Sequence, residues 1–265
     1  MAEGTAASRT IVITGAASGL GAALRTMVEA EGDRVIGVDR ADTEVVADLS
    51  TAEGRASAIA QILELSGGVV DGLVTCAGMS GVSPLLPLVN YFGTADLVTG
   101  LHDALAASAA PRVVAIGSIS STQPVYQPLV DALLVGDEAE AKAQIAAVLD
   151  GAARPETLYP SSKLAITQWA RRTAVEAGWA DAGIAINVVA PGVILTPMTV
   201  ELFKDEKMKA IMDRAVPMPL HGYAEAADIA RVVTFFLAAS TTHTTAQVTF
   251  VDGGATAITR GPSAF

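Results

Sequence analysis

Two residues capable of acid–base chemistry stand one helical turn apart in the segment LYPSSK, residues 158–163. Tyr159 carries a phenol and Lys163 an ammonium, and a spacing of four residues places both on one face of a helix. A phenol, with an ordinary pKa of about 10, is a poor base at neutral pH, but a nearby positive charge favours its ionised form. The pair could therefore exchange a proton with an alcohol. Chance spacing on an ordinary proline-started helix is the alternative.

A glycine-rich turn, TGAASGLG at residues 14–21, follows a short β-type run and precedes a helical pattern. Gly15, Gly19 and Gly21 have no side chains, so backbone N–H groups can approach a pyrophosphate, which the positive end of the helix dipole favours. The spacing G-x-x-x-G-x-G differs from the commoner G-x-G-x-x-G dinucleotide fingerprint. The turn indicates a dinucleotide site, with a purely structural turn as the alternative.

An acidic residue, Asp39, ends the second β-type run, 18 residues after Gly21. A carboxylate at this place accepts hydrogen bonds from the adenosine ribose hydroxyls and repels a 2′-phosphate. The sequence accordingly favours NAD over NADP as the cofactor. Arg40, the next residue, could partly accommodate that phosphate. For Asp39 the alternative is a turn-forming role at the end of a strand.

Short β-rich runs alternate with helical patterns along nearly the whole chain. The runs are apolar throughout, which is typical of a parallel sheet covered on both faces. We therefore predict an α/β fold, a single Rossmann-type doubly wound parallel sheet with helices on both faces, over residues 1–265. An insertion is expected at about 122–157 and a substrate lid at about 196–223. The predicted strands lie within residues 10–14, 34–39, 44–49, 69–78, 112–118, 183–192 and 247–254.

The overall composition excludes several classes of function. Apolar residues make up 51% of the chain and the net charge is −11, which argues against disorder, nucleic-acid binding and anionic membrane surfaces. No apolar stretch reaches the ~18 residues of a membrane span, and no signal peptide is evident. The three histidines are scattered, so we expect no metal site. A single cysteine, Cys76, suits a reducing compartment, and we expect a cytoplasmic protein.

Taken together, the motifs occur in the order found in one enzyme family, and over essentially its whole length the chain resembles a short-chain dehydrogenase/reductase. Three segments, at 39–55, 71–78 and 89–94, resemble most closely the bacterial 3α-hydroxysteroid dehydrogenase/carbonyl reductase group. That group also carries an insertion between its catalytic serine and tyrosine, and here the gap from Ser118 to Tyr159 is 41 residues. The motifs are TGAASGLG, Asp48 in VADLS, TCAG, Asn90 in VNYFG, Ser118 in IGSIS, YPSSK and PGVILTP.

The resemblance implies a role for each matching residue. Ser118 would hold the substrate oxygen, Tyr159 would transfer the proton, and Lys163 would bind the nicotinamide ribose and lower the pKa of Tyr159. Asn90 would anchor a water that links Lys163 to solvent. Cys76 stands where the family commonly has asparagine, and we expect it to be a buried small hydrophobe. The residues expected to bind the cofactor are Gly15, Ser18, Gly19, Leu20, Gly21, Asp39, Arg40, Asp48, Leu49, Cys76, Ala77, Gly78, Tyr159, Lys163, Pro191, Gly192, Val193 and Thr196.

The implied function is an NAD(H)-dependent oxidoreductase that interconverts a secondary alcohol and a ketone, on a bulky alicyclic substrate such as a hydroxysteroid. A broad carbonyl reductase for small ketones or quinones is the alternative within the class, and a non-catalytic dinucleotide sensor is the alternative outside it. We expect a homo-oligomer, a dimer formed through about 225–252 more than a tetramer. Lid residues that could cover an apolar ligand, or simply pack on the domain, are Met198, Phe203, Met208, Met212 and Met218.

Overall fold

A seven-stranded parallel sheet forms the centre of the protein, in a computed structural model that describes residues 8–196, 199–200 and 203–263. The strand order is β3-β2-β1-β4-β5-β6-β9 and every pairing is parallel, so the predicted doubly wound sheet is confirmed. The strands are β1 (Thr10–Thr14), β2 (Arg34–Asp39), β3 (Val45–Val46), β4 (Gly72–Thr75), β5 (Arg112–Ile116), β6 (Ala185–Pro191) and β9 (Val248–Val251).

Alternate residues of the central strands fill two separate cores, one on each face of the sheet. Val12 and Leu73 belong to the larger core, whereas Ile13, Val74 and Val114 belong to the smaller one. All five are fully buried. Because both faces are covered, these strands must be apolar on every residue, which is why their sequences do not alternate.

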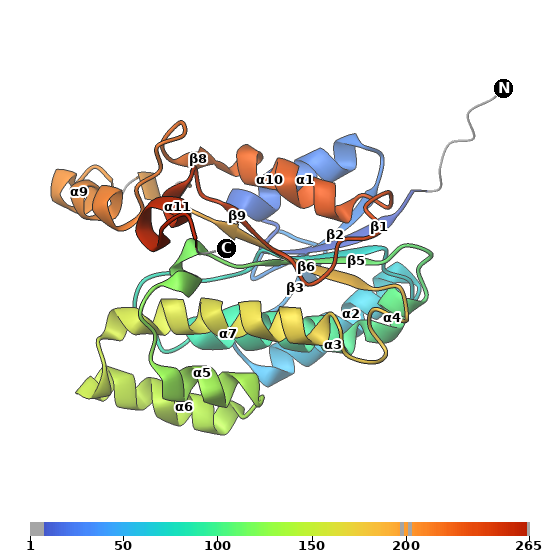
Figure 1. The fold of residues 1–265 in the computed structure, drawn as a ribbon. Coiled ribbons are helices and arrows are strands. Elements are labelled where there is room, and N and C mark those ends of the chain that lie inside the picture. Colours follow the sequence, from blue (N-terminus) through green and yellow to red (C-terminus); the bar gives the residue numbers. More distant parts are fainter. Residues whose placement is uncertain (1–7, 197–198, 201–202, 264–265) are drawn as a thin grey trace.

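Helices cover both faces of the sheet (Figure 1). On one face lie α1 (Gly19–Ala30) and α10 (Ala226–Leu237), which pack against each other. The other face is covered by α2 (Ala52–Ser66), α3 (Gly93–Gly100), α4 (His102–Ala106) and α7 (Leu158–Thr173). Within the described ranges, no helix combines the length and the apolar character needed to cross a membrane.

The segment between β5 and α7 adds a further helical layer outside α7 (Figure 1). After a short 3-10 turn at Ile119–Thr122, it forms α5 (Gln127–Leu134) and α6 (Glu138–Ala147). It then returns through a π-type turn at Val148–Ala152 and a 3-10 turn at Pro155–Thr157. Leu129, Val130 and Leu133 of α5 are buried in the larger core, so the added layer is packed as tightly as the helices beneath it.

Shorter elements gather around the carboxyl ends of the strands. They are the π-helix η1 (Leu88–Phe92), the two-stranded ribbon of β7 (Ile194–Leu195) and β8 (Ala224–Glu225), and the helices α9 (Glu206–Ala215) and α11 (Ala255–Arg260). In Figure 1 α9 and α11 lie near the end of the molecule where α7 begins. Met198, one of the residues assigned to the lid, lies outside the described residues.

Several predicted elements are shorter in the structure than in the sequence pattern. The strand expected within 44–49 is only Val45–Val46, and the strand expected at 69–78 is only Gly72–Thr75. The apolar pattern continues past these strands because Leu49 and Val70 are buried in loops. The helical pattern over residues 89–108 is divided in the structure into η1, α3 and α4, with a break at Leu101, whose φ is −99°.

Candidate active site

The glycine-rich turn joins β1 to α1 in a conformation that demands glycine. Gly15 and Gly19 have positive φ angles of 68° and 54°. A Cβ on Gly15 would lie 2.9 Å from the backbone nitrogen of Ala77, and one on Gly21 would lie 2.1 Å from the carbonyl oxygen of Gly15. Ser18, the N-cap of α1, makes no side-chain capping bond, and Leu20 is buried. The turn thus offers backbone N–H groups of a helix N-terminus to an anion.

Asp39 ends β2 beside this turn. Its Oδ2 accepts a hydrogen bond from the Ala17 N–H at 3.1 Å, and its Oδ1 accepts one from the Arg40 N–H at 2.7 Å. The carbonyl oxygen of Asp39 accepts a bond from the Ala47 N–H at 2.9 Å, which places the neighbouring Asp48 at the same edge. Hydrogen bonds with Ser50 are the main cause that lowers the pKa of Asp48, and the positive charge of Arg40 also contributes.

The loop after β4 runs past the glycine turn on its other side. The Ala77 N–H donates to the hydroxyl of Thr14 at 2.9 Å. Burial raises the pKa of the Cys76 thiol to about 12, so this cysteine is a neutral thiol and not a reactive thiolate. A Cβ on Gly78 would lie 3.1 Å from Asn90 Oδ1 and 3.8 Å from Lys163 Nζ. Gly78 therefore marks the point where the loop meets the residues expected to be catalytic.

Ser118, Tyr159 and Lys163 come together at the carboxyl end of β5. Lys163 Nζ donates a hydrogen bond to the carbonyl oxygen of Ile116 at 2.8 Å and lies 5.9 Å from the centre of the Tyr159 ring. Tyr159 hydrogen-bonds the Ser118 side chain. Ser118 Oγ also accepts the Ser120 N–H at 3.1 Å, which fixes the orientation of the hydroxyl at the end of the strand.

Asn90 connects the β4 loop to α7 through its side-chain amide. Its Oδ1 accepts the Met79 N–H at 2.8 Å, and its Nδ2 donates to the Met79 carbonyl at 3.1 Å and to Ser162 Oγ at 3.0 Å. Ser162 Oγ donates in turn to the carbonyl oxygen of Tyr159 at 2.8 Å. Asn90 lies in the π-helix η1, a type of distortion that is frequent at functional sites. The water that the resemblance assigns to Asn90 stays a prediction.

The sequence reasoning missed Ser162 and Met79. Met79 acts only through its backbone, so no side-chain motif could reveal it. Ser162 did leave a signal, because a serine is uncommon at a helix position that is fully buried, and Ser162 is 0% exposed. The neighbouring Ser161 is equally buried, and its Oγ accepts the Tyr126 N–H at 2.9 Å, which attaches the start of α5 to α7.

The segment after β6 closes the site near the glycine turn. Pro191 ends β6, and a Cβ on Gly192 would lie 2.9 Å from Met218 Sδ and 3.0 Å from Asp252 Cα. The Val193 N–H donates to Met218 Sδ at 3.3 Å. The Thr196 side chain lies 3.8 Å from the position of a Cβ on Gly19. The predicted contacts at 191–196 and 14–21 are therefore adjacent in space.

Comparison with known proteins places this arrangement in a family. A family model described as enoyl-(acyl carrier protein) reductase matches residues 15–256. A 3-alpha-hydroxysteroid dehydrogenase/carbonyl reductase of Comamonas testosteroni is 36% identical over 255 residues, which cover 94% of this chain and 97% of the relative. The crystal structure of the 3-alpha-hydroxysteroid dehydrogenase from Pseudomonas sp. B-0831 complexed with NADH is 40% identical, has a TM-score of 0.88 and covers 97% of this chain and 100% of that chain. This chain belongs to the short-chain dehydrogenase/reductase family.

A third relative, the 3beta-hydroxysteroid dehydrogenase 1 of Eggerthella lenta, is 30% identical over 266 residues, 94% of each chain. The resemblance seen in the sequence is thus confirmed. As a short-chain dehydrogenase/reductase, the protein is an oxidoreductase with a nicotinamide dinucleotide as cofactor. The site fits that group, because the N-terminus of α1 begins at this turn without a side-chain cap from Ser18, and the Asp39 carboxylate lies beside the turn. The described residues contain no group of three or more His, Cys, Asp or Glu side chains that could hold a metal.

The pKa values of Tyr159 and Lys163 in the chain alone differ from the prediction made from the sequence. Burial raises the pKa of Tyr159, and the hydrogen bond with Ser118 opposes this only in part. Burial also lowers the pKa of Lys163 from 10.5 to about 8. The expected lowering of the Tyr159 pKa is absent in the chain alone, because the burial of the phenol has the larger effect. The tyrosine of this short-chain dehydrogenase/reductase is therefore a protonated acid at rest.

We predict that Lys163→Met stabilises the protein at pH 7 while it abolishes activity. A lysine whose pKa falls from 10.5 to about 8 on folding binds fewer protons when folded, so stability rises with pH between these values. At pH 7 the buried ammonium lowers the free energy of unfolding of wild type by on the order of 3 kcal/mol. The hydrogen bond to Ile116, which the variant lacks, offsets about 1 kcal/mol of this. Urea unfolding should give a higher free energy of unfolding for the variant than for wild type at pH 7, and this difference should disappear at pH 10.

The matched control for this prediction is Lys207→Met, at an exposed position of α9. It should leave both the stability and its pH dependence unchanged, because an exposed ammonium is equally hydrated in the folded and unfolded chain. A Lys163→Met variant that is less stable than wild type at pH 7, with the same pH dependence as wild type, would show that burial does not penalise this charge.

Proposed function

We propose that the protein is an NAD(H)-dependent dehydrogenase/reductase that interconverts a secondary alcohol and a ketone on a bulky alicyclic substrate such as a hydroxysteroid. The observation that carries the proposal is the meeting of Ser118, Tyr159 and Lys163 at the sheet edge where the β4 loop and the glycine turn converge. The relatives named as hydroxysteroid dehydrogenases support the substrate class. A single free cysteine is consistent with the cytoplasmic location that the sequence favours.

The chain's own residues supply the proton chemistry. When bound, the cofactor supplies or accepts the hydride at the carbinol carbon. In ketone reduction the Tyr159 hydroxyl donates its proton to the substrate oxygen, and in alcohol oxidation the phenolate takes that proton back. Ser118, oriented by the Ser120 N–H, holds the same oxygen within reach of the phenol. Burial raises the pKa of Tyr159, so the phenol carries its proton when a ketone binds.

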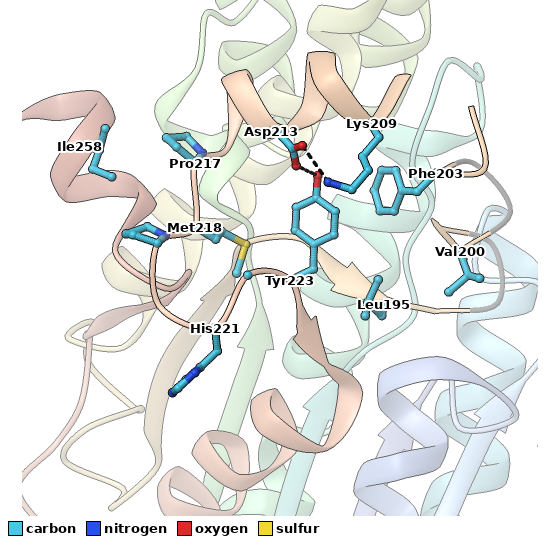
Figure 2. A pocket seen from close by; sticks show the side chains of 12 residues that line it. Leu195, Val200, Phe203, Lys209, Asp213, Pro217, Met218, His221, Tyr223 and Ile258 are labelled. Atoms are coloured by element: carbon cyan, nitrogen blue, oxygen red, sulfur yellow. Dashed lines mark hydrogen bonds and ion pairs between the residues drawn. The ribbon is translucent and has the colours of Figure 1, made fainter. Parts of the chain in front are cut away.

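Residues of the predicted lid line a cavity of about 700 Å³ (Figure 2). Its apolar walls include Leu195, Phe203 and Met218, and at one end the Tyr223 hydroxyl and Lys209 both bind Asp213. Phe203, Met212, Met218 and Tyr223 also pack against a small buried cluster that includes Ile119, the residue after Ser118. Apolar and flexible side chains near the serine suit a lid that closes over a bulky hydrophobic substrate.

Tyr159→Phe tests the mechanism directly. The change removes the hydroxyl that carries the proton and leaves the ring under Lys163, so we expect NADH binding within about two-fold of wild type and turnover lower by a factor of ~10²–10⁴. A screen of steroids, terpenoids and quinones that follows NADH absorbance provides the substrate. The same substitution at the buried Tyr91 should leave turnover intact. Full turnover in Tyr159→Phe would remove the proposed role of the phenol, and inactivity of wild type on the whole screen would favour a dinucleotide sensor.

The charges around Asp39 support NAD as the preferred form of the cofactor. A small surface hollow beside the turn is lined by Ala17, Arg25, Asp42 and Glu44, among others. Arg25 is bound to Glu44 at 2.6 and 3.0 Å and to Glu29 at 2.9 Å, so its charge is already neutralised. Arg40 is exposed, and its charge acts on Asp48. A 2′-phosphate would therefore meet mainly carboxylates at this edge.

Asp39→Ser should relax this preference. Loss of the carboxylate removes two ribose hydrogen-bond acceptors and the repulsion of a 2′-phosphate, so the ratio of kcat/KM for NAD to that for NADP should fall by about ten-fold or more. The matched control is Asp42→Asn, which removes a neighbouring charge, and asparagine tolerates the positive φ of 60° found there. Its effect on the ratio should be several-fold smaller at most. An unchanged ratio in Asp39→Ser would mean that Asp39 does not select the cofactor.

We also propose a homodimer formed through the region of about 225–252. The outer helices α5 and α6 cover α7 and so obstruct contacts between copies through that helix. In contrast, β9 is an edge strand, and Phe235 on α10 is 58% exposed. An exposed aromatic side chain and an unpaired strand edge are each costly unless a second copy covers them.

Phe235→Glu should accordingly convert the dimer into a monomer, because the new charge would be buried without a partner. Sedimentation at micromolar concentration measures the mass. Val135→Glu, at a position 78% exposed at the end of α5, should leave the mass unchanged. A wild-type tetramer that assembles through residues 158–173 would contradict the proposed interface.

A further inference from the structure

The loop between β3 and α2 lies where the adenine end of a dinucleotide would be expected. The Ala47 N–H donates to the carbonyl oxygen of Asp39 at 2.9 Å, so the loop starts beside the proposed ribose carboxylate. Asp48 is exposed next to the positive charge of Arg40, whereas Leu49 and Ser50 are buried. Asp48 is thus open to a ligand near Asp39, and Leu49 packs in the larger core.

The internal geometry of the loop leaves little freedom of movement. Asp48 Oδ1 accepts the Ser50 N–H at 2.9 Å, and the Thr51 hydroxyl donates to the Asp48 carbonyl at 3.2 Å. A Cβ on Gly54 would lie 2.0 Å from that same carbonyl oxygen, and one on Gly93 would lie 3.3 Å from the Cβ of Leu49. The loop is thus clamped between the first turns of α2 and α3, and a shift in either helix must move it.

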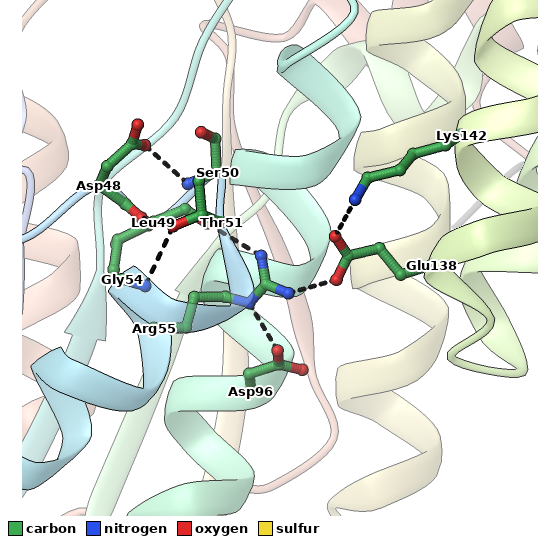
Figure 3. A network of polar contacts seen from close by, with 9 residues as sticks. All are labelled: Asp48, Leu49, Ser50, Thr51, Gly54, Arg55, Asp96, Glu138 and Lys142. Atoms are coloured by element: carbon green, nitrogen blue, oxygen red, sulfur yellow. Dashed lines mark hydrogen bonds and ion pairs between the residues drawn. The ribbon is translucent and has the colours of Figure 1, made fainter.

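Arg55 lies directly behind the loop and is only 1% exposed. Its guanidinium donates from Nη1 to the Leu49 carbonyl at 3.3 Å and from Nε to Asp96 on α3 at 2.6 Å, and its Nη2 binds Glu138 on α6 (Figure 3). The guanidinium carbon also lies 5.4 Å from the centre of the Phe92 ring. One buried cation therefore joins the loop to two separate helices.

Glu138 brings the outer helical layer into this network. Its second oxygen accepts a bond from Lys142 at 2.7 Å, one turn further along α6, which holds the carboxylate in place. The hydrogen bonds from Lys142 and Arg55 outweigh the effect of burial and lower the pKa of Glu138. Removal of one partner of a buried ion pair is strongly destabilising, since the remaining charge is left without compensation. If the charge of Glu138 is removed, Arg55 is therefore expected to move toward its remaining partners.

We propose that Arg55 and Glu138 are positioning residues for cofactor binding, through which the α6 helix of the insertion fixes the loop Asp48–Ser50 against the adenine end of the dinucleotide. The inference rests on the proposed function only in requiring that a dinucleotide binds at this edge. It assigns the insertion a role in cofactor affinity, in addition to its packing against α7. Arg55 itself does not touch the cofactor and acts through the Leu49 carbonyl.

Glu138→Gln tests the proposal, because the amide keeps the shape of the side chain and removes its charge. Titration calorimetry with NADH and, separately, with AMP measures the two affinities. We expect both to weaken by the same factor, about five-fold or more, while kcat at saturating cofactor stays at the wild-type value. AMP carries only the adenosine end, so an equal loss for both ligands locates the effect at the loop.

Asp137→Ala provides the matched control on the same helix. Asp137 is the N-cap of α6 and accepts the Glu140 N–H at 2.9 Å, so the change destabilises the helix without touching Arg55. It should lower the unfolding temperature and leave both affinities unchanged. The double variant Arg55→Met, Glu138→Met replaces the ion pair by apolar groups, which should preserve the fold and still weaken AMP binding.

Three results would overturn the proposal. These are unchanged NADH and AMP affinities in a folded Glu138→Gln variant, an equal loss of affinity in Asp137→Ala, or a loss confined to NADH with AMP unaffected. A wild-type protein that binds neither ligand would instead refute the proposed function itself, so the two failures are distinguishable.

Discussion

The site depends on the burial of one ammonium group. Lys163 is held under the carboxyl end of β5 by a hydrogen bond to Ile116 and lies against the face of the Tyr159 ring, and burial lowers its pKa to about 8. Such a group opposes folding at neutral pH, so the surrounding packing has to offset it. Burial also has a chemical consequence. Because water is excluded around the ammonium, any new charge or dipole placed beside it changes its pKa strongly. The resting chain keeps Tyr159 protonated, and the bound cofactor and substrate complete the electrostatic environment.

Positioning of this pair comes from backbone contacts between elements far apart in the sequence. The parallel sheet brings the carboxyl ends of β1, β2, β4, β5 and β6 to one edge, which is where ligands bind in open α/β folds. Side-chain amides and hydroxyls then set the finer distances. Asn90 holds Met79 at both its N–H and its carbonyl, and Ser162 connects Asn90 to the backbone of Tyr159. Hydrogen bonds thus connect the β4 loop to the first turn of α7.

Much of this could be predicted from local patterns in the sequence, and the reasons are physical. Three features of the site use residue types that few other roles require, so the sequence indicates them. They are a glycine turn with two positive φ angles, an acid at the end of β2 and a Tyr–Lys pair one helical turn apart. The resting pKa of Tyr159 could not be predicted, because burial and the place of Lys163 over the ring depend on tertiary packing. The π-helix at Asn90 and the early end of β4 could not be predicted from the sequence either, because buried loops are as apolar as strands.

The segment between β5 and α7 shows how a peripheral segment becomes part of the domain. Its helix α5 buries apolar residues in the larger core, Ser161 of α7 binds the Tyr126 backbone at its start, and Glu138 of α6 shares the charge of Arg55 with Asp96. Asp96 is a partly exposed side chain, whereas Glu138 is mostly covered, so the carboxylate from the insertion is the better shielded of the two. Coulomb attraction is stronger where water is excluded, which makes the contact with the insertion the less dispensable one. Without α6, Arg55 would keep Asp96 and the Leu49 carbonyl and lose the better shielded of its two carboxylates.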